Sequence, residues 1–287
     1  MKSRPTMRSL VVVAGLSALA LAGCSSGPSA TDTTTPAASG TGSSSVQLIA
    51  DGKLTVCTHL PYAPFQSNDD SGKTVGFDVD MMDLVAKKLG VEQAIVDTPF
   101  EGIKSGQDMA TGKCDIAAAG MTITDERKKA ILFSEPYFDA TQALLVANGS
   151  SIKTLADLKG KKLGAQSSTT GLDYANKEKD ANGYEIVEFQ DLASETQALL
   201  TGQVDGAIND LPVWSEAIKQ NPGKGAIATQ FDTGEQYGFM GQKGDADATK
   251  IMDAFNKALA TAVSDGTYEE SYQKWFDSKP AVMPKIS

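Results

Sequence analysis

The sequence predicts an α/β protein with two lobes, in which two parallel or mixed sheets are joined by a hinge of two strands. Short apolar runs alternate with segments whose apolar residues recur at the helical period. This cycle of strand and helix occurs twice along the chain. Strands that alternate with helices form parallel sheets covered by helices, so each cycle predicts one lobe.

The N-terminal end of the chain is predicted to be an export signal. Three basic residues precede an apolar run over residues 10–22, which is shorter than a membrane span. Small residues then lead to Cys24, a pattern typical of lipoprotein signal peptides. We therefore expect residues 1–23 to be removed and the Cys24 thiol to carry a diacylglycerol. The alternative is an ordinary signal peptide with a chance cysteine.

Residues 24–45 are predicted to be a flexible tether. They are almost all Ser, Thr, Gly, Pro and Ala, with one charge, and cannot bury enough apolar surface to fold. Loss of residues 1–23, which hold three basic residues and no acids, changes the net charge from −10 to −13. This acidity argues against nucleic acid as a partner and against adhesion to anionic lipid head groups. The acyl chains must therefore provide the anchoring.

The first cycle of strand and helix follows the tether. Residues 77–89 carry apolar side chains at the helical period, and a glycine at position 90 ends this helix. Thr124 can cap a later helix whose first turn holds two acids. The elements expected in this cycle are strands over 54–58, 94–97 and 115–119 and helices over 77–89 and 100–112.

The second cycle repeats this order, and two helices close the chain. A proline in the first turn of one predicted helix is compatible with that position. We expect a helical turn over 155–158, strands over 162–165, 184–189 and 206–209, and helices over 168–177, 194–202, 210–220, 246–264 and 267–276.

Two extended apolar segments link the cycles and are expected to form the hinge. The cleft between two such lobes is then the default ligand site. The expected division is lobe 1 over 46–142 and 241–287, lobe 2 over 148–236, and hinge strands over 143–147 and 237–240.

Candidate binding residues follow the predicted strands, because open α/β sheets bind ligands beyond the carboxyl ends of their strands. The set holds one cation, one anion, amide and hydroxyl groups and aromatic rings, which suits a zwitterion. It consists of His59, Tyr62, Phe100, Ala119, Gly120, Thr122, Arg127, Gln166, Thr169, Thr170, Asn209 and Asp210.

Two of these residues are expected to hold the charges of the ligand. Arg127 offers a planar fork to a carboxylate, and Asp210 offers oxygens to an ammonium group. Tyr62 and Phe100 are expected to sandwich an aliphatic stem. Taken singly, each residue has an ordinary alternative: a solvated arginine, a helix cap or a core aromatic. Their joint occurrence at matching strand ends favours binding.

The cysteines that remain after lipidation are Cys57 and Cys114. An even pair in an oxidising compartment is compatible with a disulfide, but two buried free thiols stay an equal alternative. No metal site, cofactor or catalytic residue is predicted.

Several motifs resemble those of the family 3 extracellular solute-binding proteins, the receptors of polar amino-acid ABC importers. The similarity covers essentially all of residues 46–287. It is carried by Tyr62-Ala-Pro-Phe65, Gly76-Phe-Asp-Val-Asp-Met81, Gly120-Met-Thr-Ile-Thr-Asp-Glu-Arg127, Phe133-Ser-Glu-Pro-Tyr137 and Asp265-Gly-Thr-Tyr268.

This resemblance implies a type II periplasmic-binding fold whose lobes close around an amino acid. It implies that Arg127 and the backbone of Thr122 and Thr170 take the ligand carboxylate. Asp210 and the Gly120 carbonyl would take the ammonium group. The implied partners are a free polar amino acid and the permease and ATPase subunits of an importer. The protein is expected to be a monomer, anchored by lipid to the outer face of the cell membrane.

The expected ligand is glutamine or asparagine, then glutamate or aspartate, then histidine or a basic amino acid. Residues 119–127 are similar to glutamine-binding members. His59 stands where glutamine and basic amino-acid binders carry an aspartate, so a basic ligand would lack its counter-charge. His59, Gln166 and Asn209 are expected to donate to an oxygen of the ligand side chain. A sensor for a signalling partner, or a dehydratase-type enzyme on the same fold, is the alternative function.

Overall fold

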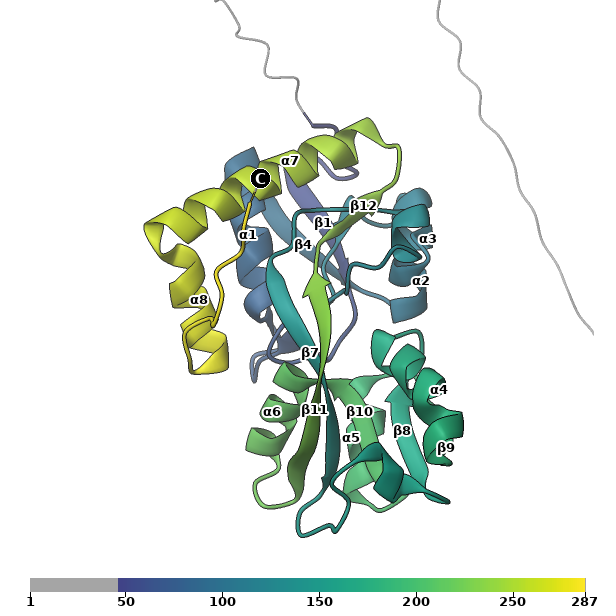
Figure 1. Ribbon diagram of the computed structural model, residues 1–287. Helices are drawn as coiled ribbons and strands as arrows, with labels where there is room; N and C mark the ends of the chain where they lie inside the picture. Colours follow the sequence, from purple (N-terminus) through teal and green to yellow (C-terminus); the bar gives the residue numbers. More distant parts are fainter. Residues whose placement is uncertain (1–45, 287) are drawn as a thin grey trace, which may run out of the picture. The chain divides into compact units, whose positions relative to one another are not determined.

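Two five-stranded sheets organise the protein in a computed structural model, of which residues 46–286 are described (Figure 1). The predicted signal peptide and tether lie outside these residues. In the first sheet β1 pairs in parallel with β4 and β5, and β12 runs antiparallel to β5 and β6. Its order is β4 (Glu92–Asp97), β1 (Lys53–Thr58), β5 (Ile116–Ala117), β12 (Met240–Gln242) and β6 (Ile131–Phe133).

The second sheet is also mixed, which confirms the predicted fold class. β8 pairs in parallel with β9 and β10, whereas β7 runs antiparallel to β10 and β11. Its order is β11 (Gly225–Tyr237), β7 (Phe138–Ala147), β10 (Gly206–Asp210), β8 (Lys162–Gln166) and β9 (Glu185–Phe189).

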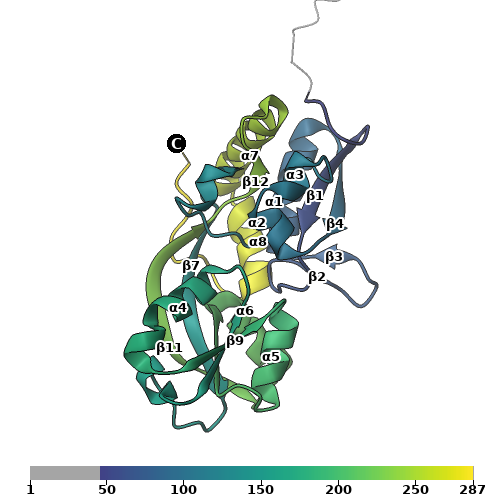
Figure 2. The ribbon, with the colours of Figure 1, turned by 90° about the vertical axis from the view of Figure 1, so that its right-hand side faces the viewer.

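Helices pack against both sheets. α1 and α7 lie side by side against the first sheet (Figure 2). Each buries one apolar stripe, which in α1 includes Phe77, Met81 and Val85. The helices of this part are α1 (Phe77–Leu89), α2 (Phe100–Lys104), α3 (Gln107–Ala110), α7 (Ala246–Asp265) and α8 (Thr267–Phe276). Those of the second part are α4 (Thr170–Asn182), α5 (Leu192–Leu200) and α6 (Leu211–Gln220).

Short strands and 3-10 turns lie between the longer elements. They are the strands β2 (Ser67–Asn68) and β3 (Thr74–Val75) and the 3-10 turns η1 (Arg127–Lys129) and η2 (Leu155–Leu158).

Two sequence expectations for helices were wrong. The helix predicted over 100–112 is split into α2 and α3, because Gly106 takes a left-handed conformation with φ 76° between them. The helix expected after Thr124 is only η1, a single 3-10 turn.

Long antiparallel strands lead from one sheet to the other. β7 follows β6 of the first sheet, and β11 leads into β12, so both connections run side by side (Figure 1). Residues 143–147, predicted as a hinge strand, form the second half of β7 within the second sheet. Residues 237–240 span the end of β11 and the start of β12. The division of the chain into lobes stays a prediction.

The first sheet contains a disulfide between Cys57 and Cys114, whose Cα atoms lie 5.6 Å apart. It ties β1 to the segment before β5, so these cysteines are not free thiols. No helix of the part that the structure describes has the length and apolar character needed to cross a membrane. Nor does any group of acidic, histidine or cysteine residues among residues 46–286 form a metal site.

Candidate ligand-binding site

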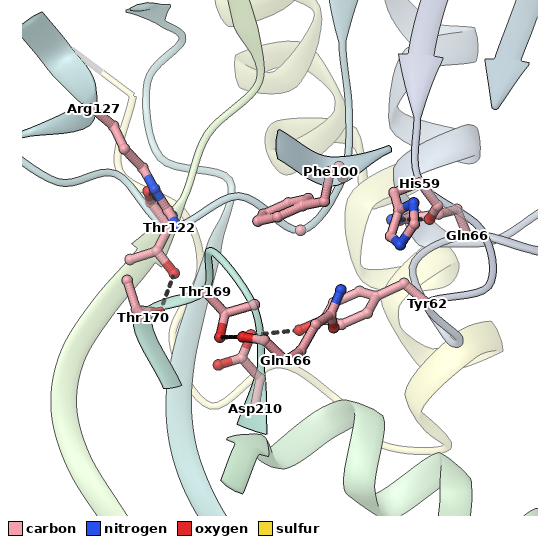
Figure 3. Close-up of a pocket in the computed structure, with 12 residues that line it drawn as sticks. His59, Tyr62, Gln66, Phe100, Thr122, Arg127, Gln166, Thr169, Thr170 and Asp210 are labelled. Atoms are coloured by element: carbon pink, nitrogen blue, oxygen red, sulfur yellow. Dashed lines mark hydrogen bonds between the residues drawn. The ribbon is translucent and has the colours of Figure 1, made fainter. Parts of the chain in front are cut away.

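One pocket gathers eleven of the twelve candidate residues (Figure 3). The space between atoms in this pocket amounts to about 340 Å³, which includes solvent at its mouth. The exception among the candidates is Asn209, and the lining residue that sequence reasoning missed is Gln66. The lining consists of His59, Tyr62, Gln66, Phe100, Ala119, Gly120, Thr122, Arg127, Gln166, Thr169, Thr170 and Asp210.

Arg127 forms the cationic end of the pocket. Its side chain is buried, and it donates to the carbonyl oxygens of Thr122 at 2.8 Å and Ser168 at 3.1 Å. The guanidinium lies 6.0 Å from the centre of the Phe100 ring. Burial lowers the pKa of Arg127, although nearby acids oppose this shift. No carboxylate within residues 46–286 lies at ion-pair distance from it, so the buried charge is available to an anion.

The start of α4 lies near Arg127, because Arg127 bonds to the carbonyl of Ser168, two residues before the helix. The Thr169 side chain caps this helix by accepting from the Leu172 N–H at 3.1 Å. The first N–H groups of a helix have no carbonyl partner within it and attract anions. The Thr122 and Thr170 hydroxyls lie 3.3 Å apart, and both contact the Glu235 carboxylate. Their side chains therefore face Glu235.

Asp210 forms the anionic end. It ends β10, is buried, and accepts from the Tyr62 hydroxyl at 2.7 Å. The Tyr237 hydroxyl and the Gln142 amide also donate to it. Burial raises the pKa of Asp210 to about 6, and the negative charge of Glu235 adds to this shift. A cation placed here would favour the ionised carboxylate.

The floor between these ends is fixed by Gly120, which has a φ of 54°. A Cβ at this position would lie 2.8 Å from the Tyr62 ring, so a side chain would displace Tyr62. The Gly120 N–H donates to the Asp78 carboxylate at 2.9 Å, and Tyr137 donates to the same group at 2.6 Å. Burial raises the pKa of Asp78 to about 7. Asp78 thus holds the Gly120 backbone in place.

The part of the pocket that holds His59, Gln66 and Gln166 is lined by polar side chains. His59 Nδ1 lies 3.0 Å from the Thr98 carbonyl oxygen, and the His59 ring lies 6.3 Å from that of Phe100. The Gln66 amide nitrogen donates to the His59 carbonyl at 3.3 Å. His59 Nε2, Gln66 Oε1 and Gln166 Oε1 are buried and have no hydrogen-bond partner among residues 46–286.

Asn209 lies behind the lining rather than in it. Its amide nitrogen donates to Glu195 at 3.0 Å, and its oxygen accepts from Tyr62 at 3.0 Å. Neighbouring strand residues point to opposite faces, so Asp210 faces the pocket and Asn209 does not. The expectation that Asn209 donates to the ligand is therefore not supported by its position. Sequence reasoning also missed Glu195, whose burial in α5 raises its pKa to about 8.

Known proteins match this chain over most of its length. A probable histidine-binding protein of Neisseria gonorrhoeae is 32% identical over 264 residues, which cover 91% of this chain and 92% of the relative. An ancestral arginine-binding protein has been solved with arginine, at 40% identity and a TM-score of 0.73, covering 78% of this chain and 98% of that chain. A structure described as an ancestral arginine-binding protein bound to glutamine also gives 40% identity and a TM-score of 0.73, covering 80% of this chain and 100% of that chain.

A further solved structure is relevant to the alternative that the protein is a dehydratase-type enzyme. It is an ancestral amino-acid-binding protein described as a precursor of cyclohexadienyl dehydratase, at 36% identity and a TM-score of 0.68, covering 78% of this chain and 95% of that chain. Residues 54–278 match the family described as bacterial extracellular solute-binding proteins, family 3. The chain belongs to this family.

Proposed function

We propose that the protein captures a free amino acid in the pocket and delivers it to an ABC importer. The observation that carries this proposal is the pairing of buried Arg127 with buried Asp210 around one small cavity. A buried cation and a buried anion match the carboxylate and the ammonium group of a zwitterion.

The pose follows from these two charges. The ligand carboxylate lies against the Arg127 guanidinium and the first N–H groups of α4. The ammonium group lies against Asp210, and the stem lies between the rings of Tyr62 and Phe100. In this pose each ligand charge displaces water and pairs with a buried charged group that forms no ion pair within residues 46–286.

Closure of two lobes is the proposed means of capture. Arg127 precedes β6 of the first sheet, whereas Asp210 ends β10 of the second. A ligand that bridges both residues stabilises the closed arrangement by its greater affinity for that arrangement. We further propose that lipid on Cys24 holds the protein at the outer face of the membrane, next to the permease.

The names of the relatives bear on the side chain of the ligand. They favour histidine and arginine over the glutamine-first order that sequence reasoning gave. The ancestral protein bound to glutamine keeps that amino acid among the candidates. We therefore propose arginine, histidine and glutamine as the first ligands to test.

The experiment is a thermal-shift screen of the common amino acids, followed by calorimetry on those that raise the melting temperature. A binder should lose its effect when its carboxylate is converted to an amide or its amino group is acetylated. Recovery of the unchanged amino acid after incubation, checked by mass spectrometry, would support capture over catalysis. If no amino acid raised the melting temperature, the proposed function would be wrong.

A further inference from the structure

We propose that Gln66 and His59 form a pair of hydrogen-bond acceptors that selects amino acids whose side chains end in N–H donors. This inference rests on the proposed function and concerns the far end of the same pocket. Both residues line the pocket beside Tyr62 (Figure 3). Each holds a buried acceptor atom without a partner within the described residues.

The orientation of the Gln66 amide is fixed by a backbone carbonyl. Gln66 is 1% exposed, and its Nε2 donates to the His59 oxygen at 3.3 Å. A carbonyl oxygen can only accept, so the amide nitrogen must face it. The amide oxygen is thereby left as the free end of the side chain, which offers an acceptor to a ligand.

The His59 ring is oriented in the same way. Its Nδ1 lies 3.0 Å from the Thr98 carbonyl oxygen, which again can only accept. Nδ1 must therefore carry the proton, and in the neutral imidazole Nε2 keeps a lone pair. Because Nε2 is buried and no group in the described part of the chain donates to it, His59 adds a second acceptor. Sequence reasoning had expected His59 to donate to an oxygen of the ligand, and this bond to Thr98 argues against that role.

These two acceptors restrict which ligand side chains the pocket can bind. An amide, guanidinium, imidazole or ammonium end can donate N–H groups to Nε2 and Oε1. An ionised carboxylate can only accept hydrogen bonds. Its oxygens would face the lone pairs of His59 Nε2 and Gln66 Oε1, and both of these atoms would stay without a donor. Buried polar groups without a partner are costly, and sites built to bond one polar group discriminate strongly against an analogue that lacks it. Glutamate and aspartate are therefore excluded by this end of the pocket.

Isosteric pairs of amino acids test this restriction on the unaltered protein. Calorimetry compares glutamine with glutamate and asparagine with aspartate, together with arginine, histidine and lysine. The tightest ligand should carry an N–H donor at its end and bind about 100-fold or more tightly than either acid. Glutamate or aspartate binding as tightly as the best donor would overturn the inference while leaving the proposed function intact.

A variant tests the role of Gln66 itself. Gln66→Met keeps the length of the side chain and removes the acceptor. The preference for the best donor over glutamate should fall to about 10-fold or less, while amino-acid binding persists. Gln220→Met, an exposed change on α6, is the control and should leave the preference unchanged. An unchanged preference in a folded Gln66→Met protein would contradict the role assigned to Gln66. If the unaltered protein bound no amino acid at all, the proposed function would be contradicted as well.

Discussion

At the scale of single residues, three buried carboxyl groups surround the pocket. Burial raises the pKa of Asp210 to about 6, of Asp78 to about 7 and of Glu195 to about 8. Each group therefore holds a proton in the folded protein at pH values where the unfolded chain has released it. Because the native state binds more protons in this range, the free energy of unfolding falls as the pH rises.

Glu195 provides the clearest test of this linkage. Its contribution should decline as the pH rises from about 4.5, its ordinary pKa, to about 8, its pKa in the folded protein, and should level off above that. Glu195→Gln cannot titrate and retains an oxygen for the Asn209 amide. Its melting temperature should match that of the unaltered protein at pH 5 and exceed it increasingly towards pH 8.5.

The control for this experiment is Glu185→Gln, which changes the same charge on an exposed strand position. It should follow the pH profile of the unaltered protein. A constant difference between Glu195→Gln and the unaltered protein at every pH would contradict the assigned burial effect.

Sequence alone could predict which residues surround the ligand but not how each is hydrogen-bonded. Arg127 and Asp210 were found because each follows a strand and carries a charge that a zwitterion needs. Gln66 and Glu195 carried no such signal, since their roles depend on burial and on partners distant in the chain. The direction of donation at His59 depends on Thr98, which is 39 residues away.

At the scale of elements, the start of α1 depends on one glycine. Gly76 has a φ of 145°, and a Cβ there would lie 2.0 Å from the Phe65 carbonyl oxygen. The N–H groups of Phe77 and Asp78 donate to the carbonyls of Pro64 and Phe65 at 3.0 Å. The helix thereby begins against the loop that carries Tyr62, which ties α1 to the wall of the pocket.

Gly76→Ala should therefore be severely destabilising, by about 4 kcal/mol or more, because backbone atoms cannot yield to the added carbon. Gly72→Ala is the matched control. Gly72 also has a positive φ, 81°, but an added Cβ would meet nothing within 4 Å. This second change should cost only about 1 kcal/mol in urea denaturation. Similar losses for both variants would contradict the steric argument.

The elements that the sequence predicted best are those whose apolar residues recur at a regular spacing. α1 begins and ends where its apolar spacing and the following glycine indicated, at Phe77 and Leu89. β11 was missed over most of its length, because it alternates polar and partly buried residues without an apolar run. Gly102 and Gly106 both lie inside the helix predicted over 100–112, and the structure identifies Gly106 as the break between α2 and α3.

At the scale of the whole molecule, hydrogen bonds join the part of the chain that forms the first sheet to the part that forms the second. The Ser168 hydroxyl, just before α4, donates to the Glu101 carboxylate at the start of α2. The Ser168 carbonyl accepts from Arg127, so this residue is held on two sides. Ser168 adopts a φ of 69°, which non-glycine residues seldom take. These hydrogen bonds would stabilise the proposed closed form in addition to the contacts that the ligand makes.

Removal of the exposed contact should shorten the lifetime of the complex. Glu101→Ala is expected to raise the rate of ligand release by roughly 2- to 5-fold, because exposed polar contacts contribute little each. Stopped-flow measurement of dissociation checks this. Asp125→Ala removes an exposed acid that pairs with Lys128, three residues further along the chain, and should leave the rate unchanged. Equal rates for Glu101→Ala and the unaltered protein would show that this contact does not stabilise the closed form.

The central claim is that Arg127 holds the carboxylate of a free amino acid while Asp210 holds its ammonium group. The most direct measurement is calorimetry of Arg127→Ala with the best amino acid and with its carboxamide derivative. The variant should bind the amino acid about 2–5 kcal/mol more weakly, because a buried carboxylate loses its partner. The carboxamide should bind both proteins weakly and nearly equally. An unchanged affinity of Arg127→Ala for the amino acid, or an equal loss for both ligands, would contradict the account.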